Sequence, residues 1–371
     1  MKEKEIENEI KPKNIYYIGF NFDSSFFSVG TDIGFQIYQT NPLNIIISRQ
    51  LNGGIGLVKI LEKSNLICLV GGGQYPRFAP NKLIIWDDIK NEIKEEIRCN
   101  SFIMNCYIKQ NCIFIICSDN IFIINIKTMK IIKEINTVNN PRGISSVSND
   151  PKKYIIAFPD HSKGNILIMN CEQLEKSNDE QMKKLEKIDN QIQPIKNAHK
   201  GNINVLSLNY NGSKIASTSD RGTLIRVFDT KTKTLISEFR RGTTDAFIYS
   251  LNFSFDNSLL GLTSDHGSCH IFSLNSSKPN EKDEKSKNSG VMSYITSSFP
   301  FSGVGKKISN ALGQGQEYSW KKFEIPHKVQ SFISFLKEDN KNVFIIDKSG
   351  NYLSVNLTDG VEPKINKTKL I

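Results

Sequence analysis

The feature that most constrains this sequence is a repeated pattern of short apolar runs separated by polar turns. About seven units follow one another at a spacing near 40 residues, which is the period of a four-stranded propeller blade. Asn211 followed by Gly212, and Ser349 followed by Gly350, are typical turn dipeptides between such runs. In chain order, the units cover residues 16–38, 56–87, 103–126, 144–169, 203–241, 248–274 and 329–357.

Because a closed ring removes most exposed strand edges, the repeat predicts an all-β fold, a seven-bladed WD40-like β-propeller. Residues 1–12 form an N-terminal tail that alternates charges and lacks the apolar core of a signal peptide. We therefore expect a single domain over residues 13–371. The most apolar stretch, residues 112–126, is interrupted by Ser118, Asp119 and Asn120, so it predicts a hairpin and not a membrane span.

Two tracts interrupt the repeat. Residues 171–197 are charged and predict a solvated loop insertion. Residues 275–320 form a longer insertion in the sixth unit, and its second half carries large apolar side chains with only Lys306 and Lys307 as charges. A loop this apolar is costly in water, so we expect it to bury either in a membrane interface or against the ring. The residues expected to enter the membrane are Tyr294, Ile295, Phe299 and Phe301.

The charge balance favours acidic partners. Lysine and arginine number 48 against 38 acidic residues, which gives a formal net charge of +10. Membrane surfaces and nucleic acids both attract such a chain. A nucleic-acid groove needs basic residues interleaved with exposed aromatic residues. Because the sequence shows no such interleaving, we expect no nucleic-acid partner.

Neither the cysteines nor the glycine-rich stretches predict chemistry. The seven cysteines lack a CxxC spacing or a nearby histidine, so we expect no metal site and a reducing compartment, with Cys112 and Cys117 buried in strands. Residues 53–56 lack the strand–turn–helix context of a dinucleotide site, and Lys307 stands where a P-loop needs serine or threonine. No G-x-S-x-G or HExxH motif occurs. We therefore expect neither enzymatic activity nor a cofactor.

The candidate functional element is a four-residue stretch, here called the arginine motif: Phe239, Arg240, Arg241 and Gly242. It ends an alternating run, 234–239, that predicts a strand. Successive side chains of a strand point to opposite faces, so Arg240 and Arg241 diverge. Gly242 allows the backbone to turn directly afterwards. Since guanidinium binds phosphate through a planar, bidentate fork, we infer two phosphate pockets, one on each side of the strand.

A simpler interpretation is that the arginines pair with nearby acids such as Glu238 or Asp245. The flanking residues favour phosphate binding, because hydroxyl groups and protonated imidazoles donate hydrogen bonds to phosphate and inositol oxygens. The two flanks belong to consecutive predicted blades. Before the motif lie His199, Ser217, Thr218, Ser219, Thr223 and Arg226, and after it lie Thr243, Thr244, Ser264, His266 and His270.

This arrangement resembles the PROPPIN family, the phosphoinositide-binding β-propellers of autophagy that include the WIPI proteins. The resemblance covers nearly the whole chain. It is strongest in residues 198–201, 222–229, 239–242 and 270–272, and it extends to 20–23 and 28–31 in the first blade and 80–86 in the second. The chain departs from the family pattern in Asp245 and Asp265, two acids beside the anion sites.

The resemblance implies a propeller that stands edge-on to a membrane and has two sites for phosphatidylinositol 3-phosphate and phosphatidylinositol 3,5-bisphosphate. The implied first site comprises Arg240, His199, Ser219, Thr223 and Arg226. The implied second site comprises Arg241, Thr244, Ser264 and His270. The blade-six insertion corresponds to the membrane-inserting loop of the family. Pro76 and Arg77 occupy the place of a blade-two loop that recruits an autophagy lipid-transfer protein.

We therefore expect a non-enzymatic adaptor that binds 3-phosphorylated phosphoinositides and recruits partners to membranes. Its expected location is cytoplasmic, peripheral on autophagosomal, endosomal or vacuolar membranes, and we expect a monomer in solution. The alternative is a WD40-type protein–protein interaction scaffold that does not bind lipid. That alternative predicts an arginine pair engaged inside the ring.

Overall fold

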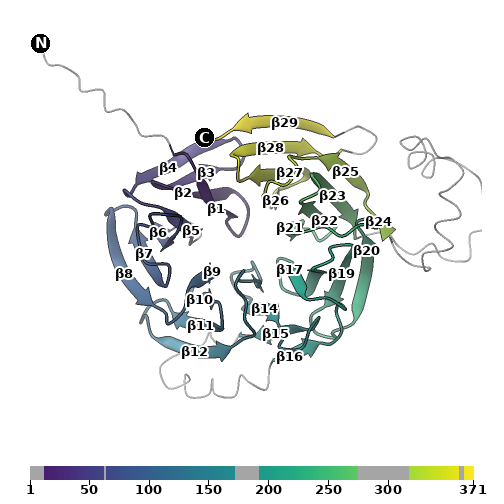
Figure 1. Ribbon diagram of the computed structural model, residues 1–371, viewed down its shortest axis with the longest axis horizontal. Coiled ribbons are helices and arrows are strands. Elements are labelled where there is room, and N and C mark those ends of the chain that lie inside the picture. The colour runs from purple at the N-terminus through teal and green to yellow at the C-terminus, as the bar shows by residue number, and fades with distance from the viewer. Residues whose placement is uncertain (1–11, 62–63, 172–191, 275–316, 359–362) are drawn as a thin grey trace, which may run out of the picture.

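The repeated apolar runs form strands, which assemble into seven sheets around a central opening (Figure 1). This computed structural model describes residues 12–61, 64–171, 192–274, 317–358 and 363–371. Each sheet is one blade, so the chain is a seven-bladed β-propeller as the repeat predicts. No helix within the described ranges is long and apolar enough to cross a membrane.

The first four blades follow one another in chain order. Blade one contains β1 (Ile15–Phe20), β2 (Phe26–Thr31), β3 (Gly34–Gln39) and β4 (Asn44–Gln50). Blade two contains β5 (Ile55–Ile60), β6 (Leu66–Gly71), β7 (Lys82–Asp87) and β8 (Glu92–Arg98). Blade three contains β9 (Ile103–Ile108), β10 (Cys112–Cys117), β11 (Asn120–Asn125) and β12 (Ile131–Asn136). Blade four contains β13 (Ser146–Val147), β14 (Ile155–Pro159), β15 (Ile166–Asn170) and β16 (Gln193–Ile195).

The last three blades complete the ring. Blade five contains β17 (Ile203–Leu208), β18 (Lys214–Ser219), β19 (Leu224–Asp229) and β20 (Leu235–Arg240), and β24 (Glu317–Tyr318) adds to its outer edge. Blade six contains β21 (Ile248–Phe253), β22 (Leu259–Ser264), β23 (Ser268–Ser273) and β25 (Lys321–Glu324). Blade seven contains β26 (Ser331–Leu336), β27 (Asp339–Asp347), β28 (Asn351–Asn356) and β29 (Lys364–Lys369).

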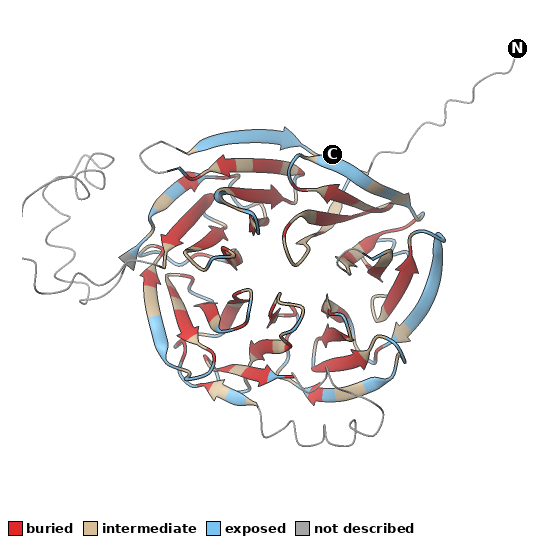
Figure 2. Ribbon diagram, turned by 180° about the vertical axis from the view of Figure 1, so that it is seen from behind, coloured by how far each residue is buried: buried red, intermediate tan, exposed pale blue. Residues whose placement is uncertain are grey.

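The position of a strand in its blade decides its composition. Neighbouring blades cover both faces of a middle strand, so such a strand is apolar on both sides. Every residue of β10 is buried, whereas every described residue of the outermost strand β29 is exposed. Figure 2 shows this gradient as red inner strands inside a pale blue rim. The core is therefore a ring of apolar layers, one between each pair of adjacent blades.

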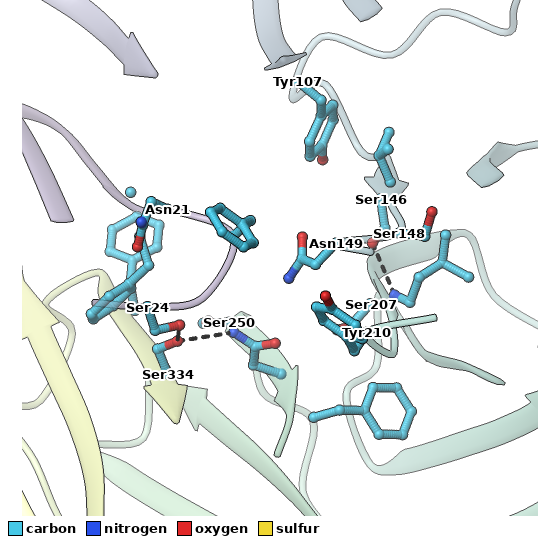
Figure 3. Close-up of a pocket in the computed structure, with 18 of the residues that line it drawn as sticks. Asn21, Ser24, Tyr107, Ser146, Ser148, Asn149, Ser207, Tyr210, Ser250 and Ser334 are labelled. Carbon is cyan, nitrogen blue, oxygen red and sulfur yellow. Dashed lines mark hydrogen bonds between the residues drawn. The ribbon is translucent and has the colours of Figure 1, made fainter. Parts of the chain in front are cut away.

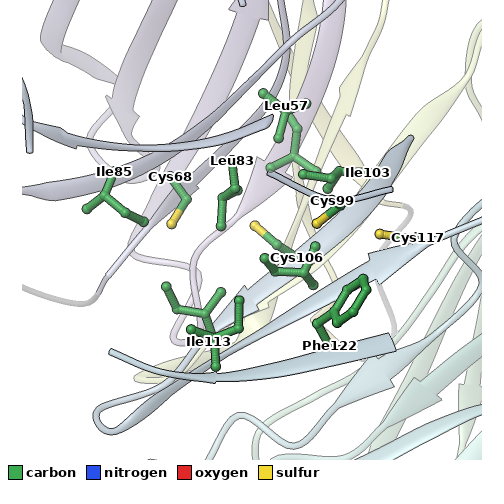
Figure 4. Close-up of a cluster of buried hydrophobic side chains, with 13 residues drawn as sticks. Leu57, Cys68, Leu83, Ile85, Cys99, Ile103, Cys106, Ile113, Cys117 and Phe122 are labelled. Carbon is green, nitrogen blue, oxygen red and sulfur yellow. The ribbon is translucent and has the colours of Figure 1, made fainter. Parts of the chain in front are cut away.

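One of these layers, between blades two and three, contains four cysteines. Cys68, Cys99, Cys106 and Cys117 pack among Leu57, Ile85 and their neighbours (Figure 4). All seven cysteines of the chain are buried and have free thiols. The prediction that Cys112 and Cys117 lie buried in a strand is therefore confirmed, since both belong to β10.

The ring closes between blades seven and one mainly through side chains, with one backbone hydrogen bond of 3.4 Å from the Lys337 amide to the Asp23 carbonyl. The chain after Leu357 forms β29, so blade seven consists of consecutive C-terminal strands. The Tyr352 hydroxyl donates a hydrogen bond to the Thr40 carbonyl at 2.5 Å, and the Tyr352 ring lies 6.1 Å from that of Phe27. Ser24 and Ser334 share a second hydrogen bond across the junction. Within the described residues, the closure thus depends on packing and not on a shared strand ladder.

The two predicted insertions lie mostly outside the described residues. Residues 172–191 belong to the first and 275–316 to the second. The predicted tract 171–197 also contains β16, which completes blade four. The predicted tract 275–320 ends with β24, which pairs in parallel with β20.

Replacement of Tyr352 with phenylalanine tests the ring closure. Tyr352→Phe keeps the aromatic contact but leaves the buried Thr40 carbonyl without its donor. We expect the free energy of unfolding to fall by about 1–3 kcal/mol, measured by urea denaturation. Tyr75→Phe is the control, because Tyr75 is highly exposed and should show no loss. Equal urea midpoints for Tyr352→Phe and the wild type would contradict this account of closure.

Candidate functional site

The arginine motif ends strand β20, whose two faces meet different blades. Phe239 pairs with Ile225 of β19, is fully buried, and packs against Phe272 of blade six with ring centroids 5.1 Å apart. Arg240 pairs with Leu224 and occupies the opposite face, toward blade four. Arg241 follows on the same side as Phe239. The two guanidinium groups therefore leave the strand on opposite sides, as the alternation predicts.

A row of polar residues lies on the face of blade five that carries Arg240. Ser217, Arg226 and Glu238 are neighbours across β18, β19 and β20. The buried His199 shares a hydrogen bond of 2.9 Å between its Nε2 atom and Ser217 Oγ. Ser219 follows Ser217 on the same face of β18. The structure thus brings His199, Ser219, Arg226 and Arg240 to one side of the blade, and we call this set the first cluster.

Arg226 of the first cluster is occupied by the protein itself. Its Nε atom donates to Glu238 at 2.6 Å, and its Nη1 atom donates to the Ala198 carbonyl at 2.7 Å. Its charge is therefore already compensated by a carboxylate. Thr223 lies in the turn before β19, where its carbonyl accepts the Arg241 amide at 2.9 Å. We infer that Arg226 and Thr223 hold the site in shape.

Arg241 is buried on the other face, between blades five and six. Its Nε atom donates to the Gly222 carbonyl at 2.8 Å, and its Nη2 atom donates to the Thr244 carbonyl. Within the described residues, its hydrogen-bond partners are carbonyl oxygens and not carboxylates. Thr244 therefore contributes its backbone to holding Arg241 in place.

His270 lies within a chain of hydroxyl groups on the face of blade six toward Arg241. Ser264 and Ser268 hydroxyls lie 3.4 Å apart, and Ser268 Oγ lies 3.1 Å from His270 Nε2. Ser319 Oγ lies 3.3 Å from the other ring nitrogen, Nδ1. Ser264 and His270 are buried. Arg241, Ser264, Ser268, His270 and Ser319 form what we call the second cluster.

Sequence reasoning missed Ser268, Ser319 and Lys322. Ser319 and Lys322 follow the long insertion, far from the arginine motif in sequence. Lys322 stands directly across from His270 in the β23–β25 ladder, and its exposed ammonium adds a second cation beside Arg241. Its charge is one of the influences that lower the pKa of His270. The alternation of β25, which buries Phe323, could identify Lys322 only once the register with β23 is known.

Both histidines are neutral at physiological pH. Burial lowers the pKa of His199 to about 4, with a smaller contribution from the Arg226 charge. Burial likewise lowers the pKa of His270 to about 3, assisted by Lys322 and Arg241. In the protein alone the imidazoles therefore act as neutral hydrogen-bonding groups. The expectation that protonated imidazoles donate to phosphate does not describe the unliganded clusters.

Each of the acids near the motif has a partner within the described chain. Glu238 forms an ion pair with Arg226 at 2.6 Å, and Asp245 forms an exposed one with Arg221 at 3.2 Å. Asp265, beside Ser264, accepts a hydrogen bond from the Phe247 amide at 3.0 Å. Burial lowers the pKa of Arg241, and the charges of Asp265 and Asp245 partly oppose that shift.

Gly242 has open space around its Cα atom. Apart from its chain neighbours Arg241 and Thr243, a Cβ atom built at this position meets no described atom within 4 Å. The φ angle of Gly242 does not lie in the left-handed region. The backbone turn predicted there therefore does not require glycine. The space is available to a group from outside the described chain.

The other predicted residues lie elsewhere. Pro76 and Arg77 are exposed in the β6–β7 loop, on the opposite side of the ring from β20 (Figure 1). The Arg77 amide donates to the Gly54 carbonyl at 3.0 Å, which ties this loop to the start of blade two. Tyr294, Ile295, Phe299 and Phe301 lie outside the described residues. No group of metal-ligating side chains occurs in the described part of the chain.

The PROPPIN family model matches residues 15–357. Autophagy-related protein 18 of Dictyostelium discoideum is 30% identical over 96% of this chain and 93% of its own. SVP1-like protein 2 of Schizosaccharomyces pombe is 35% identical over 70% of this chain and 68% of its own. Among solved structures, Kluyveromyces lactis Hsv2 with a complete loop 6CD has a TM-score of 0.73 and 21% identity, covering 96% of this chain and 99% of its own.

The two neutral histidines predict a loss of stability in acid. A histidine whose folded pKa lies below its unfolded value of 6.5 binds fewer protons when folded, so its stabilising contribution falls as the pH drops from about 6.5 toward 4. We expect each histidine to lower the free energy of unfolding by ~2 kcal/mol between pH 7 and pH 5, measured by urea denaturation.

The double variant His199→Asn/His270→Asn removes both buried imidazoles. His161→Asn is the control, because His161 is exposed. The double variant should lose much of the difference in stability between the two pH values, whereas the control should keep it. A double variant as pH-dependent as the wild type would show that the buried histidines are not the cause.

Proposed function

Because the chain belongs to the PROPPIN family, we propose that it is an adaptor that binds phosphatidylinositol 3-phosphate and phosphatidylinositol 3,5-bisphosphate and recruits partners to autophagic and endosomal membranes. The family and the autophagy-related relatives support the coarser statement, a phosphoinositide-binding, autophagy-related β-propeller. The family is generally non-enzymatic, and the proposed role needs no cofactor.

The observation that carries this proposal is the pair of arginines on opposite faces of β20. Arg240 belongs to the first cluster and Arg241 to the second, and each cluster has a buried histidine with a serine hydroxyl in contact. A guanidinium fork with neighbouring hydroxyl donors is suited to a phosphorylated inositol ring. A protein–protein interaction scaffold that does not bind lipid would not require two clusters of such similar composition.

The path of the chain after the long insertion supports attachment at one edge. Tyr318 pairs with Arg240, Ser319 contacts His270, and Lys322 stands across from His270. The insertion therefore returns to the described chain directly beside both clusters. We propose that its residues Tyr294, Ile295, Phe299 and Phe301 enter the same membrane that presents the headgroups. Several weak contacts then act together through effective concentration.

The exposed β6–β7 loop is the proposed partner site. Tyr75, Pro76 and Arg77 are exposed in blade two, across the ring from the arginine motif in blade five, so a partner bound there would not compete with the membrane. The solved complex of KlAtg21 with the coiled-coil of AgAtg16 covers 97% of this chain with a TM-score of 0.71 at 22% identity. That neighbour shows that a ring of this shape can hold an autophagy protein, and we propose the same kind of partner here.

Vesicle recruitment tests the lipid function. Arg240→Thr/Arg241→Thr removes both forks, and we expect recruitment to vesicles with phosphatidylinositol 3-phosphate to fall at least ~10-fold, because hydrogen bonds between charged groups are lost at both clusters. Arg98→Thr is the control, because Arg98 is exposed in β8 on the far side of the ring. Unchanged recruitment of the double variant in a co-flotation assay would remove the basis of the proposal.

Lys322 and Lys321 provide a matched pair for the second cluster. Lys321 points away from His270, and its Nζ atom donates to the Thr358 carbonyl at 2.6 Å. We expect Lys322→Ala to weaken binding of a soluble short-chain phosphatidylinositol 3-phosphate to the second cluster roughly fivefold, or ~1 kcal/mol, and Lys321→Ala to leave it unchanged. Calorimetry on Arg240→Thr protein isolates that cluster. Equal effects of the two lysines would show that only general charge matters.

A further inference from the structure

A cavity of about 260 Å³ lies at the centre of the ring, away from the arginine motif. Its walls come from the innermost strands of all seven blades, β1, β5, β9, β13, β17, β21 and β26, and from the loops that follow several of them. Figure 3 shows Asn21 and Ser24 on one side of this space, with Asn149 and Tyr107 reaching into it from another. The two lipid-binding clusters proposed above do not line it.

The charge of the cavity is entirely positive. Of the residues that line it, only Lys59 and Lys109 carry a charge, and none is aspartate or glutamate. The remaining lining residues are hydroxyl, amide, aromatic and aliphatic. A cavity lined by two cations and no carboxylate favours an anionic occupant.

Lys59 lacks a compensating charge from the described chain. Its Nζ atom lies over the rings of Tyr17 and Tyr107, at 5.7 Å and 5.2 Å from the ring centroids. Burial raises the pKa of both tyrosines, so both phenols are neutral and offer only their π faces and hydroxyl groups. Within the described residues no carboxylate forms an ion pair with Lys59. Burial lowers the pKa of Lys59, but Tyr17 and Tyr107 raise it further, so the amine stays a cation. A buried cation with no carboxylate partner attracts an anion.

Lys109 fixes the second positive charge on the cavity wall. Its Nζ atom donates to the Ser148 carbonyl at 2.7 Å and to the Asp150 carbonyl at 2.6 Å. These neutral dipoles orient the ammonium group without cancelling its net charge. Lys59 in β5 and Lys109 just after β9 come from neighbouring blades, so the positive charge is concentrated on one side of the cavity.

The hydroxyl groups of the cavity have two different roles. Several tie adjacent blades together: Ser146 accepts from the Leu208 amide at 2.9 Å, and Ser250 accepts from the Ile333 amide at 3.2 Å. By contrast, the side chains of Ser207 and Asn149 make no hydrogen bond to other described residues. Ser207 is nevertheless 94% buried, with 6% of its surface exposed. These two polar groups are available to a ligand that carries hydroxyl groups.

We propose that the central cavity binds a small, soluble phosphorylated sugar or polyol. Its phosphate would lie at Lys59, where it supplies the missing negative charge, and its hydroxyl groups would contact Asn149 and Ser207. A volume of about 260 Å³ accommodates a single-ring sugar phosphate, near the lower limit of small-molecule sites. The site is separate from the lipid-binding edge, so this proposal does not depend on the proposed function.

Calorimetric titration with three probes tests the proposal: glucose 6-phosphate, glucose and inorganic phosphate. We expect glucose 6-phosphate to bind more tightly than inorganic phosphate, and glucose to bind most weakly. Lys59→Met should weaken glucose 6-phosphate binding about 10-fold or more, as expected when a charged hydrogen-bond donor is removed. Lys94→Met is the control, because Lys94 is exposed in β8. Arg240→Thr/Arg241→Thr should bind the probe as the wild type does.

Ser207→Val provides an independent variant if Lys59→Met does not fold, and we expect it to weaken glucose 6-phosphate binding severalfold through the loss of one hydroxyl contact. Thermal unfolding of both variants, with and without the probe, checks their integrity. Folded Lys59→Met protein should still be recruited to phosphoinositide vesicles. The proposal is overturned by the absence of binding to any probe, by equal affinity in folded Lys59→Met or Ser207→Val protein, or by loss of glucose 6-phosphate binding only in the double arginine variant.

Discussion

The burial of Phe239 against Phe272 is the contact on which the functional edge depends. It fixes which face of β20 meets blade six, and the alternation of the strand then sends Arg240 the other way. A strand shifted by one residue would bury an arginine and expose the phenylalanine, at a large cost in free energy. The two-sided arrangement of cations is therefore a consequence of core packing. Headgroup binding would use the placement of the two arginines on opposite faces of β20, which the packing of the core already requires.

The unliganded clusters are held in shape by bonds within the protein. Arg226 is paired with Glu238, Arg241 is bound to two carbonyl oxygens, and both histidines are neutral. An approaching phosphate thus meets oriented groups and loses little side-chain entropy in ordering them. Because the chain that follows the insertion runs beside both clusters, headgroup contacts and loop insertion would occur at the same edge of the ring.

The sequence was sufficient for the parts of this account that depend on local pattern. The propeller repeat and the opposite directions of Arg240 and Arg241 follow from periodicity alone. The pairing of Arg226 with Glu238 depends on which of several nearby acids lies across the sheet, and the neutral state of His199 and His270 depends on burial by neighbouring blades. Lys322 was missed because its contact with His270 joins residues that are distant in sequence.

The central claim is that the two faces of β20 each hold one headgroup. The most direct measurement is the calorimetric stoichiometry of a soluble short-chain phosphatidylinositol 3-phosphate. The account predicts two molecules bound per wild-type chain, and one per chain in either single variant, Arg240→Thr or Arg241→Thr. One molecule bound per wild-type chain, or complete loss of binding in either single variant, would contradict it.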